Sequence, residues 1–202
     1  MKMIGDLHIH SRFSMATSRE GTPENLDFWA RKKGISLIGT GDFTHPVWRE
    51  ELKERLVTEG NGLYRLRDEY VKEESRKFPG KGTHFVVSGE ISSIYKKNGK
   101  TRKVHNVILL PSLEAADTMA QRLEKIGNIH SDGRPILGLD SHDLLEMMLD
   151  VCPDGILIPA HIWTPHFSVL GAKSGFDSVE ECFEELTPYV HALETGLSSD
   201  PA

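Results

Sequence analysis

Residues 3–10 read MIGDLHIH and combine the pattern of a β-strand with that of a metal site. Apolar side chains alternate with Asp6, His8 and His10, and alternate residues of an extended strand point to the same face. An ordinary half-buried strand would place Ser, Thr or Lys at these positions, whereas imidazoles two residues apart can both bind one metal ion. We therefore predict a strand over residues 3–9 with ligands on one face. Asp6 is either a partner that orients a ligand histidine or a plain strand-end carboxylate.

A β-α-β unit begins with this strand. Thr22, Pro23 and Glu24 are typical of a helix start, with an N-cap hydroxyl, a proline at the first helical position and an acidic first turn. Gly34 ends the helix, and residues 35–40 read as the next strand. Apolar runs and helical patterns keep alternating along the chain, so we expect an α/β fold around a parallel sheet or barrel.

The remaining elements are predicted from the same kinds of signal. Asn98-Gly99 is a hairpin-turn sequence, and strand patterns at 91–95 and 104–110 flank it. The segment 127–135 has the weakest pattern and is expected to be a surface loop. The other predicted strands are 84–91, 155–159 and 190–194, and the other predicted helices are 46–56, 65–77, 112–126, 141–150 and 179–186.

The composition is that of one globular domain with a sizeable core, with 202 residues of which 38% are hydrophobic and 27% charged. No apolar run approaches the roughly 18 to 20 residues that cross a bilayer, so we expect a cytoplasmic protein without a membrane partner. Cys152 and Cys182 stand alone and are expected to be reduced. The net charge of −6 argues against nucleic-acid binding through the whole surface, although a local basic strip could still bind it.

Further potential ligands recur at the ends of predicted strands. In barrels of alternating strands and helices, the carboxyl ends of the strands and the loops after them form the active-site face. We therefore expect these side chains to gather with the two N-terminal histidines in one cluster. They lie within or just after apolar runs: Asp42 and His45 in GTGDFTH, Glu90 in SGE, His105 in KVHN and His161 in PAHI.

These motifs resemble those of the PHP (polymerase and histidinol phosphatase) superfamily of metal-dependent phosphoesterases. The matching motifs span almost the whole chain and are DLHIHS, GTGDFTHP, GEI, VHNVILLP and PAHIW. More narrowly, GDFTHPVW, LGLDSHDLLEMML, PAHIWTPHFSVLGAKSGFDSVEECF and HALETGLSSDP are similar to endonuclease Q, a PHP enzyme that nicks DNA beside deaminated bases. The resemblance implies one PHP domain over residues 1–202, folded as a distorted (β/α)7 barrel.

This barrel is expected to be cut before its last strand. A closed barrel usually needs roughly 200 to 250 residues or more, and residues 196–202 read as a loop just after the last predicted strand. The family's final motif, Asp-x-His, is absent, which implies that one ligand of each of two metal sites is missing. We therefore expect a missing C-terminal region of the same protein as a partner, and a chain that is weakly active or inactive alone. The oligomeric state stays open.

The resemblance also implies how the ligands are divided. His8 and His10 would bind one metal ion, and Glu90 would bridge it to a second. His105 and His161 would complete the second site. The mixed imidazole and carboxylate ligands suit zinc first, with two or three ions in all, and manganese or magnesium are alternatives.

A third metal site would include Asp42. PHP proteins often carry a histidine directly after this aspartate, but Phe43 takes that place here, which leaves open whether His45 substitutes. The catalytic residues implied by the resemblance are Glu90, Asp42 and His161.

Cations surround the predicted hairpin tip beside Glu90 and His105. They suit phosphate contact or, equally, a solvated edge hairpin that is kept charged. A tryptophan nearby is expected to stack on an everted base, and a loop histidine is expected either to line the cleft or to be structural. The predicted substrate-binding residues are Lys96, Lys97, Lys100, Arg102, Trp163 and His166.

A cluster of His, Asp and Glu without an activated Ser or Cys nearby indicates metal-assisted hydrolysis with water as the nucleophile. The leading hypothesis is a DNA-repair endonuclease that nicks beside deaminated bases or abasic sites. One alternative is a PHP phosphatase that acts on a small phosphate monoester. The other is a non-catalytic PHP module whose metal ions only stabilise the fold.

Overall fold

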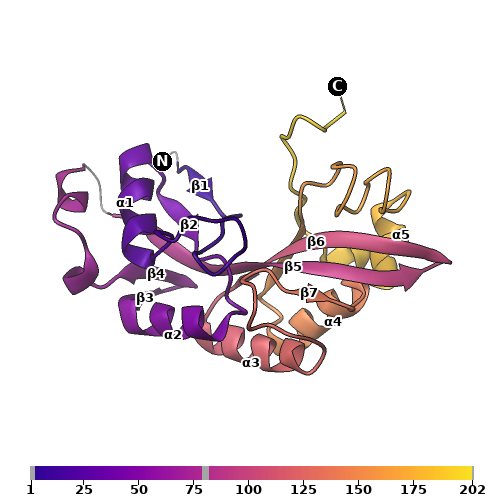
Figure 1. Cartoon of the computed structure of the whole chain (residues 1–202), viewed down its shortest axis with the longest axis horizontal. Helices are drawn as coiled ribbons and strands as arrows, with labels where there is room; N and C mark the ends of the chain where they lie inside the picture. Colours follow the sequence, from indigo (N-terminus) through magenta and orange to yellow (C-terminus); the bar gives the residue numbers. More distant parts are fainter. Residues whose placement is uncertain (1–2, 79–81, 202) are drawn as a thin grey trace.

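The fold is built on a mixed β-sheet that curls through the length of the molecule (Figure 1). The computed structural model describes residues 3–78 and 82–201, and eight strands of this part belong to the sheet. The strands are β1 (Gly5–Asp6), β2 (Leu37–Gly39), β3 (Leu56–Gly60), β4 (Leu63–Leu66), β5 (His84–Lys97), β6 (Lys100–Leu110), β7 (Ile136–Leu137) and β8 (Ile156–Pro159).

The α/β class is confirmed, but the strands are not uniformly parallel. Strands β1, β2 and β5 are parallel neighbours, as expected for β-α-β units. Strand β6 pairs with β5 in antiparallel orientation, and β8 in turn pairs with β6 in antiparallel orientation. The reason is the predicted turn at Asn98-Gly99, where both residues have positive φ and return the chain directly along β5 without a crossover helix.

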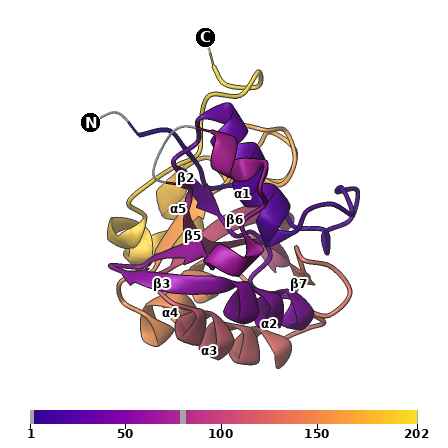
Figure 2. The ribbon, with the colours of Figure 1, turned by 90° about the vertical axis from the view of Figure 1, so that its left-hand side faces the viewer.

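The first helix begins and ends where the local signals predict. Thr22 Oγ1 accepts a hydrogen bond from the Asn25 amide, and Gly34 ends the first helix in the left-handed conformation. Figure 2 shows α2, α3 and α4 side by side along one face of the sheet. No helix in the described ranges is both long and apolar enough to cross a bilayer. The α-helices are α1 (Pro23–Lys33), α2 (Pro46–Arg55), α3 (Leu113–Glu124), α4 (Ser141–Val151) and α5 (Val179–Phe183), and the short 3-10 helices are η1 (Asp68–Tyr70), η2 (Ser75–Lys77) and η3 (Glu184–Tyr189).

The two faces of the sheet have different surroundings. Successive residues of β6 point to opposite faces, and Ile108 belongs to the large core that α2, α3 and α4 cover. Val107 and Leu109 instead form a small apolar cluster with Ala160. Glu90 pairs with Val107 in the register of β5 and β6, so its side chain lies on the face opposite the large core.

The helix predicted at 65–77 is wrong. Residues 63–66 form β4, which pairs with β3, and the following residues form only η1 and η2. The cause is Gly60-Asn61-Gly62, three consecutive residues with positive φ that turn the chain into a hairpin. The charged side chains after the turn resemble a helical pattern without forming an α-helix.

Other predicted boundaries differ from those in the structure by a few residues. The first strand covers Gly5–Asp6 instead of 3–9, and the helix predicted at 179–186 ends at Phe183 and continues as η3. Residues 190–194 are not assigned as a strand. Glu194 still makes strand-like backbone hydrogen bonds, because its amide donates to the Pro159 carbonyl at 3.1 Å and its carbonyl accepts from the Ile162 amide at 3.0 Å.

Candidate metal centre

Four histidines surround the buried carboxylate of Glu90. The side chain of Glu90 is 1% exposed, and its oxygens lie 3.4 Å from His8 Nε2, 3.3 Å from His10 Nε2, 2.7 Å from His105 Nδ1 and 3.5 Å from His161 Nε2. These contacts form two groups of potential ligands that share Glu90, one with His8 and His10 and one with His105 and His161. The structure thus brings together five of the seven side chains predicted as metal ligands.

The sheet explains why residues so far apart in sequence meet here. Glu90 lies in β5 and His105 in β6, on the same face of the hairpin. His8 and His10 follow β1, which reaches β5 through the parallel strand β2. His161 follows β8, which pairs with β6. The cluster is therefore assembled by strand pairing.

Three of the imidazoles are held at the ring nitrogen that faces away from Glu90. A partner at that nitrogen fixes the tautomer and the rotation of the ring, which is the usual arrangement of metal-binding histidines. Each pair leaves Nε2 directed at the Glu90 carboxylate. The pairs are His8 Nδ1 with Glu194 Oε1 at 2.9 Å, His10 Nδ1 with Asp42 Oδ1 at 3.0 Å and His161 Nδ1 with Thr164 Oγ1 at 2.9 Å.

Asp42 is fully buried, and protein donors already occupy both of its carboxylate oxygens. The amide and hydroxyl of Ser11 donate to Oδ2 at 2.8 and 2.6 Å, and the Ser14 hydroxyl donates to Oδ1 at 2.9 Å. The preceding Gly41 has φ of 64°, and a Cβ there would lie 2.6 Å from a carbonyl oxygen of the chain just before His10. This close approach places Asp42 where it orients His10. Its assignment to a third metal site stays a prediction.

The carboxylates and imidazoles shift one another's pKa. Burial alone would lower the pKa of His8, but interactions with Glu194 and Glu90 raise it to about 10. Burial is likewise outweighed at His10, where Asp42 and Glu90 raise the pKa to about 9. Burial would raise the pKa of Glu90, yet the surrounding histidines hold it far below its usual range. Glu90 is therefore ionised throughout the physiological pH range.

The donor set fits divalent metal ions. Glu90 Oε1 and His105 Nδ1 are buried and only 2.7 Å apart, yet neither is aligned for a hydrogen bond with any residue of the described ranges. Buried polar atoms normally have a partner, and two such ligand atoms side by side suit a shared cation. Burial also lowers the pKa of His105, which favours the neutral imidazole that binds metals.

Two residues at the site are missing from the predicted set. Glu194 holds His8 and also accepts a hydrogen bond from the His161 amide at 2.6 Å. It ends the last predicted strand, so the strand-end pattern could have revealed it. Arg134 Nη1 lies 3.3 Å from Glu90 Oε2. It belongs to the segment 127–135, where no periodic pattern marks it.

His45, Trp163 and His166 are among the predicted residues that lie outside the ligand groups. His45 Nε2 is 3.1 Å from the carbonyl oxygen of His130, and its ring stacks on Phe13 with 4.1 Å between centroids. Trp163 is half-buried against the core, and His166 is exposed. Whether His45 binds a metal ion therefore stays a prediction, and His166 is the more available of the other two for a substrate.

The basic hairpin has two kinds of cation. Lys97 and Arg102 are each paired with a glutamate, at 2.7 Å and 3.1 Å, and Arg102 also binds the carbonyl oxygen of Gly175. Lys96 and Lys100 are exposed near the tip. Lys96 and Lys100 are therefore the more available for phosphate contact.

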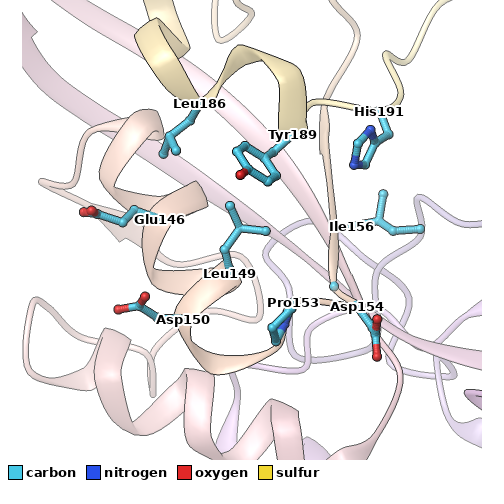
Figure 3. A pocket seen from close by; sticks show the side chains of 10 residues that line it. Glu146, Leu149, Asp150, Pro153, Asp154, Ile156, Leu186, Tyr189 and His191 are labelled. Atoms are coloured by element: carbon cyan, nitrogen blue, oxygen red, sulfur yellow. The ribbon is translucent and has the colours of Figure 1, made fainter.

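Two further features lie away from Glu90. His142, Glu184 and Glu185 form a third group of potential ligands, but both glutamates are exposed. A pocket of about 480 Å³ lies between α4, η3 and the start of β8, and no member of the Glu90 cluster lines it. Figure 3 shows side chains that line this pocket. Its lining includes Glu146, Leu149, Asp150, Ile156, Leu186 and Tyr189.

Comparison with known sequences finds two uncharacterised relatives, and no protein-family model matches the chain. A protein of Methanocaldococcus jannaschii is 33% identical over 175 residues, which cover 86% of this chain and 18% of that protein. A protein of Bacillus subtilis is 28% identical over 210 residues, which cover 98% of this chain and 49% of that protein. The chain thus spans less than half the length of each relative.

Solved structures share the fold. The lesion-specific endonuclease PfuEndoQ from Pyrococcus furiosus matches 98% of this chain and 43% of its own, with a TM-score of 0.77 and 28% identity. Endonuclease Q in complex with a 27-mer duplex that has an abasic lesion at the active site matches 90% of this chain and 40% of its own, with a TM-score of 0.70 and 28% identity. A protein described as a metal-dependent phosphoesterase, from Bifidobacterium adolescentis, matches 95% of this chain and 77% of its own, with a TM-score of 0.57 and 14% identity, and shows likeness of fold alone.

Proposed function

We propose that this chain, which belongs to the PHP superfamily and is related within it to endonuclease Q, forms the metal-binding part of a phosphodiester hydrolase that nicks damaged DNA. The observation that carries the proposal is the pair of ligand groups that share Glu90. Neighbouring cation sites of this kind are typical of enzymes that cleave phosphate esters. The expected cut lies beside a deaminated base or an abasic site.

His8 and His10 would hold one ion with Glu90, and His105 and His161 would hold a second, with zinc favoured and manganese or magnesium as alternatives. When bound, the ions would polarise the phosphate and lower the pKa of a water molecule toward neutrality. The protein's part is to keep the Glu90 carboxylate ionised and the imidazoles in position.

We assign roles at the reacting centre to Glu90 and His161, and a role through His10 to Asp42. The contacts of Asp42 and Glu194 with ligand histidines preset the ring orientations, so little rearrangement is needed when ions bind. Preset ligands favour catalysis because the centre need not be ordered during the reaction.

DNA is the proposed substrate because endonuclease Q, solved with a duplex, matches 90% of this chain. Phosphate groups flanking the cut would meet the exposed cations Lys96 and Lys100, and His166 in the loop after β8 would face the same substrate. The proposed substrate surface also includes three less accessible residues, which are Trp163, Lys97 and Arg102.

The direct test is a nicking assay on duplexes with one uracil, hypoxanthine or abasic site, with an undamaged duplex beside them. The full-length protein that contains this chain, loaded with zinc or manganese, should nick the damaged strands and leave the undamaged duplex intact, because the chain alone is expected to be weakly active or inactive. Glu90→Ala, which removes the shared ligand, is the control for contaminating nucleases. Nicking no greater than that of Glu90→Ala would end the proposal.

Charge reversal separates this function from a phosphatase that acts on small monoesters. The double variant Lys96→Glu and Lys100→Glu should weaken cleavage of duplex DNA, because cations that contact phosphates contribute to affinity. Hydrolysis of p-nitrophenyl phosphate should be nearly unchanged. Equal effects on both substrates, or hydrolysis of the monoester alone, would favour the phosphatase. Metal ions that stabilise the fold without hydrolysis of either substrate would indicate the non-catalytic module.

A further inference from the structure

We propose that Arg134 binds the phosphate group of the substrate at this centre. The inference rests on the proposed phosphoester chemistry and not on DNA as the carrier of the phosphate. Among the lysines and arginines of residues 3–78 and 82–201, only Arg134 forms an ion pair with the cluster, with Nη1 at 3.3 Å from Glu90 Oε2. The side chain of Arg134 is 37% exposed and that of Glu90 is 1% exposed. The guanidinium therefore lies on the solvent side of the buried carboxylate, where a substrate arrives.

The loop that carries Arg134 is held on both sides. The Arg134 amide donates to Asp132 Oδ1 at 2.9 Å, and the Thr44 hydroxyl donates to the Gly133 carbonyl at 3.1 Å. After Arg134, the Pro135 carbonyl accepts a hydrogen bond from β5 at 3.0 Å, and the chain continues into β7, which pairs with β5. A side chain mounted this way is positioned before any substrate binds, which limits the entropy lost on binding.

At Gly133, this loop packs closely against the residues that orient the metal ligands. A Cβ at Gly133 would lie 2.3 Å from Asp42 Oδ2 and 2.7 Å from Ser14 Oγ, so only glycine lets the backbone pass here. Asp42 in turn holds His10. The close packing of Gly133 on Asp42 therefore couples the position of the Arg134 guanidinium to the position of a ligand histidine.

Charge explains why this guanidinium would take a phosphate. Without metal ions, the cation of Arg134 is one of the groups that balance the buried anion of Glu90. Divalent ions at Glu90 would take over that balance and leave the guanidinium beside like charge, where it needs a new anion. Guanidinium presents a planar fork of N–H donors that matches two oxygens of a phosphate. A phosphate group would bind the metal ions and the arginine at the same time.

The test measures binding of inorganic phosphate to the zinc-loaded chain by calorimetry, together with bound zinc by elemental analysis. Arg134→Met should weaken phosphate binding about ten- to a hundredfold, the range expected for loss of a hydrogen bond between charged groups. Arg134→Lys, which keeps the charge without the fork, should fall between Arg134→Met and the wild-type protein. Zinc content should stay at the wild-type value in both variants. The matched control is Arg122→Met, because Arg122 is 42% exposed and pairs with Asp150 at 3.5 Å outside the cluster.

Unchanged phosphate affinity in Arg134→Met overturns the inference, and so does a wild-type protein that binds no phosphate. A loss of affinity accompanied by loss of zinc also overturns it, because Arg134 would then act through the metal ions. Circular dichroism identifies a variant that does not fold, and Arg134→Lys then supplies the comparison. Failure of the nuclease proposal looks different, since phosphate binding would still depend on Arg134 while damaged duplexes stay intact.

Discussion

The substitution Asp42→Asn tests how the metal centre is oriented. Asparagine has the same shape and tolerates positive φ as aspartate does, so the backbone at φ of 52° is preserved. The change removes the negative charge and turns one acceptor oxygen into an NH₂ donor. All the contacts of the carboxylate come from donors, namely the Ser11 amide and hydroxyl, the Ser14 hydroxyl and His10 Nδ1.

The size of the effect follows from these contacts. Oδ2 accepts from Ser11, and Oδ1 accepts from Ser14 and His10, so an amide can satisfy only one side. Losing a charged acceptor for buried donors should lower the free energy of unfolding of the metal-free chain by about 2 to 3 kcal/mol. Metal affinity should fall about 10- to 100-fold, as expected when the partner of a ligand histidine is removed.

Two assays read these effects separately. Urea denaturation in EDTA gives the stability, and competition with a chromogenic chelator gives the zinc affinity. Asp27→Asn is the matched control, because Asp27 is fully buried and accepts from Arg31 Nε at 2.9 and 2.8 Å outside the cluster. It should lose stability and keep zinc affinity. Wild-type zinc affinity in Asp42→Asn would refute the orienting role, and the loss of one whole ion per chain would make Asp42 a ligand.

Three further predictions follow from the same geometry. Gly133→Ala places a Cβ 2.3 Å from Asp42 Oδ2 and should lower the free energy of unfolding by about 1 to 3 kcal/mol, whereas Gly138→Ala, with open space around its Cβ, should leave the melting temperature nearly unchanged; equal melting temperatures would contradict this packing. The pKa values of His8 and His10, about 10 and 9, lie above 7, so both imidazoles are protonated at pH 7 without metal. Zinc binding at pH 7 should therefore release about two protons, and affinity should rise with pH up to these pKa values; calorimetry in buffers of different ionisation enthalpy checks this, and binding without proton release would disprove it. Glu194→Gln should weaken zinc binding about tenfold in the chelator assay, and unchanged affinity would remove Glu194 from the centre.

Much of the fold could be predicted because its signals are local. Thr22, Gly34 and Asn98-Gly99 act within a few residues of themselves, and each produces the expected cap or turn. The hairpin of β3 and β4 escaped prediction because Gly60-Asn61-Gly62 competes with a charged helical pattern, and the turn decides the outcome. The antiparallel hairpin of β5 and β6 follows from the Asn98-Gly99 turn, whereas β8 pairs with β6 from far along the chain, which local patterns do not encode.

The site, like the fold, was predictable only in part. His8 and His10 follow β1 and His161 follows β8, as the strand-end pattern predicts. Glu90 and His105 instead lie within β5 and the antiparallel strand β6, and strand pairing brings them to the same cluster. The role of Asp42 was not predictable, because it depends on donors from the loop that follows residue 10. Arg134 was missed because a surface loop carries it to Glu90, and no periodicity marks such an approach.

The most direct measurement is the number of divalent ions that the purified chain binds, determined by elemental analysis after equilibration with zinc. The two ligand groups that share Glu90 predict two ions per chain in the wild-type protein. Glu90→Gln keeps one oxygen and loses the other ligand atom, so it should hold one ion or fewer while its metal-free fold stays intact by circular dichroism. A wild-type chain that binds no zinc, or a Glu90→Gln variant that keeps both ions, would contradict the shared-carboxylate centre.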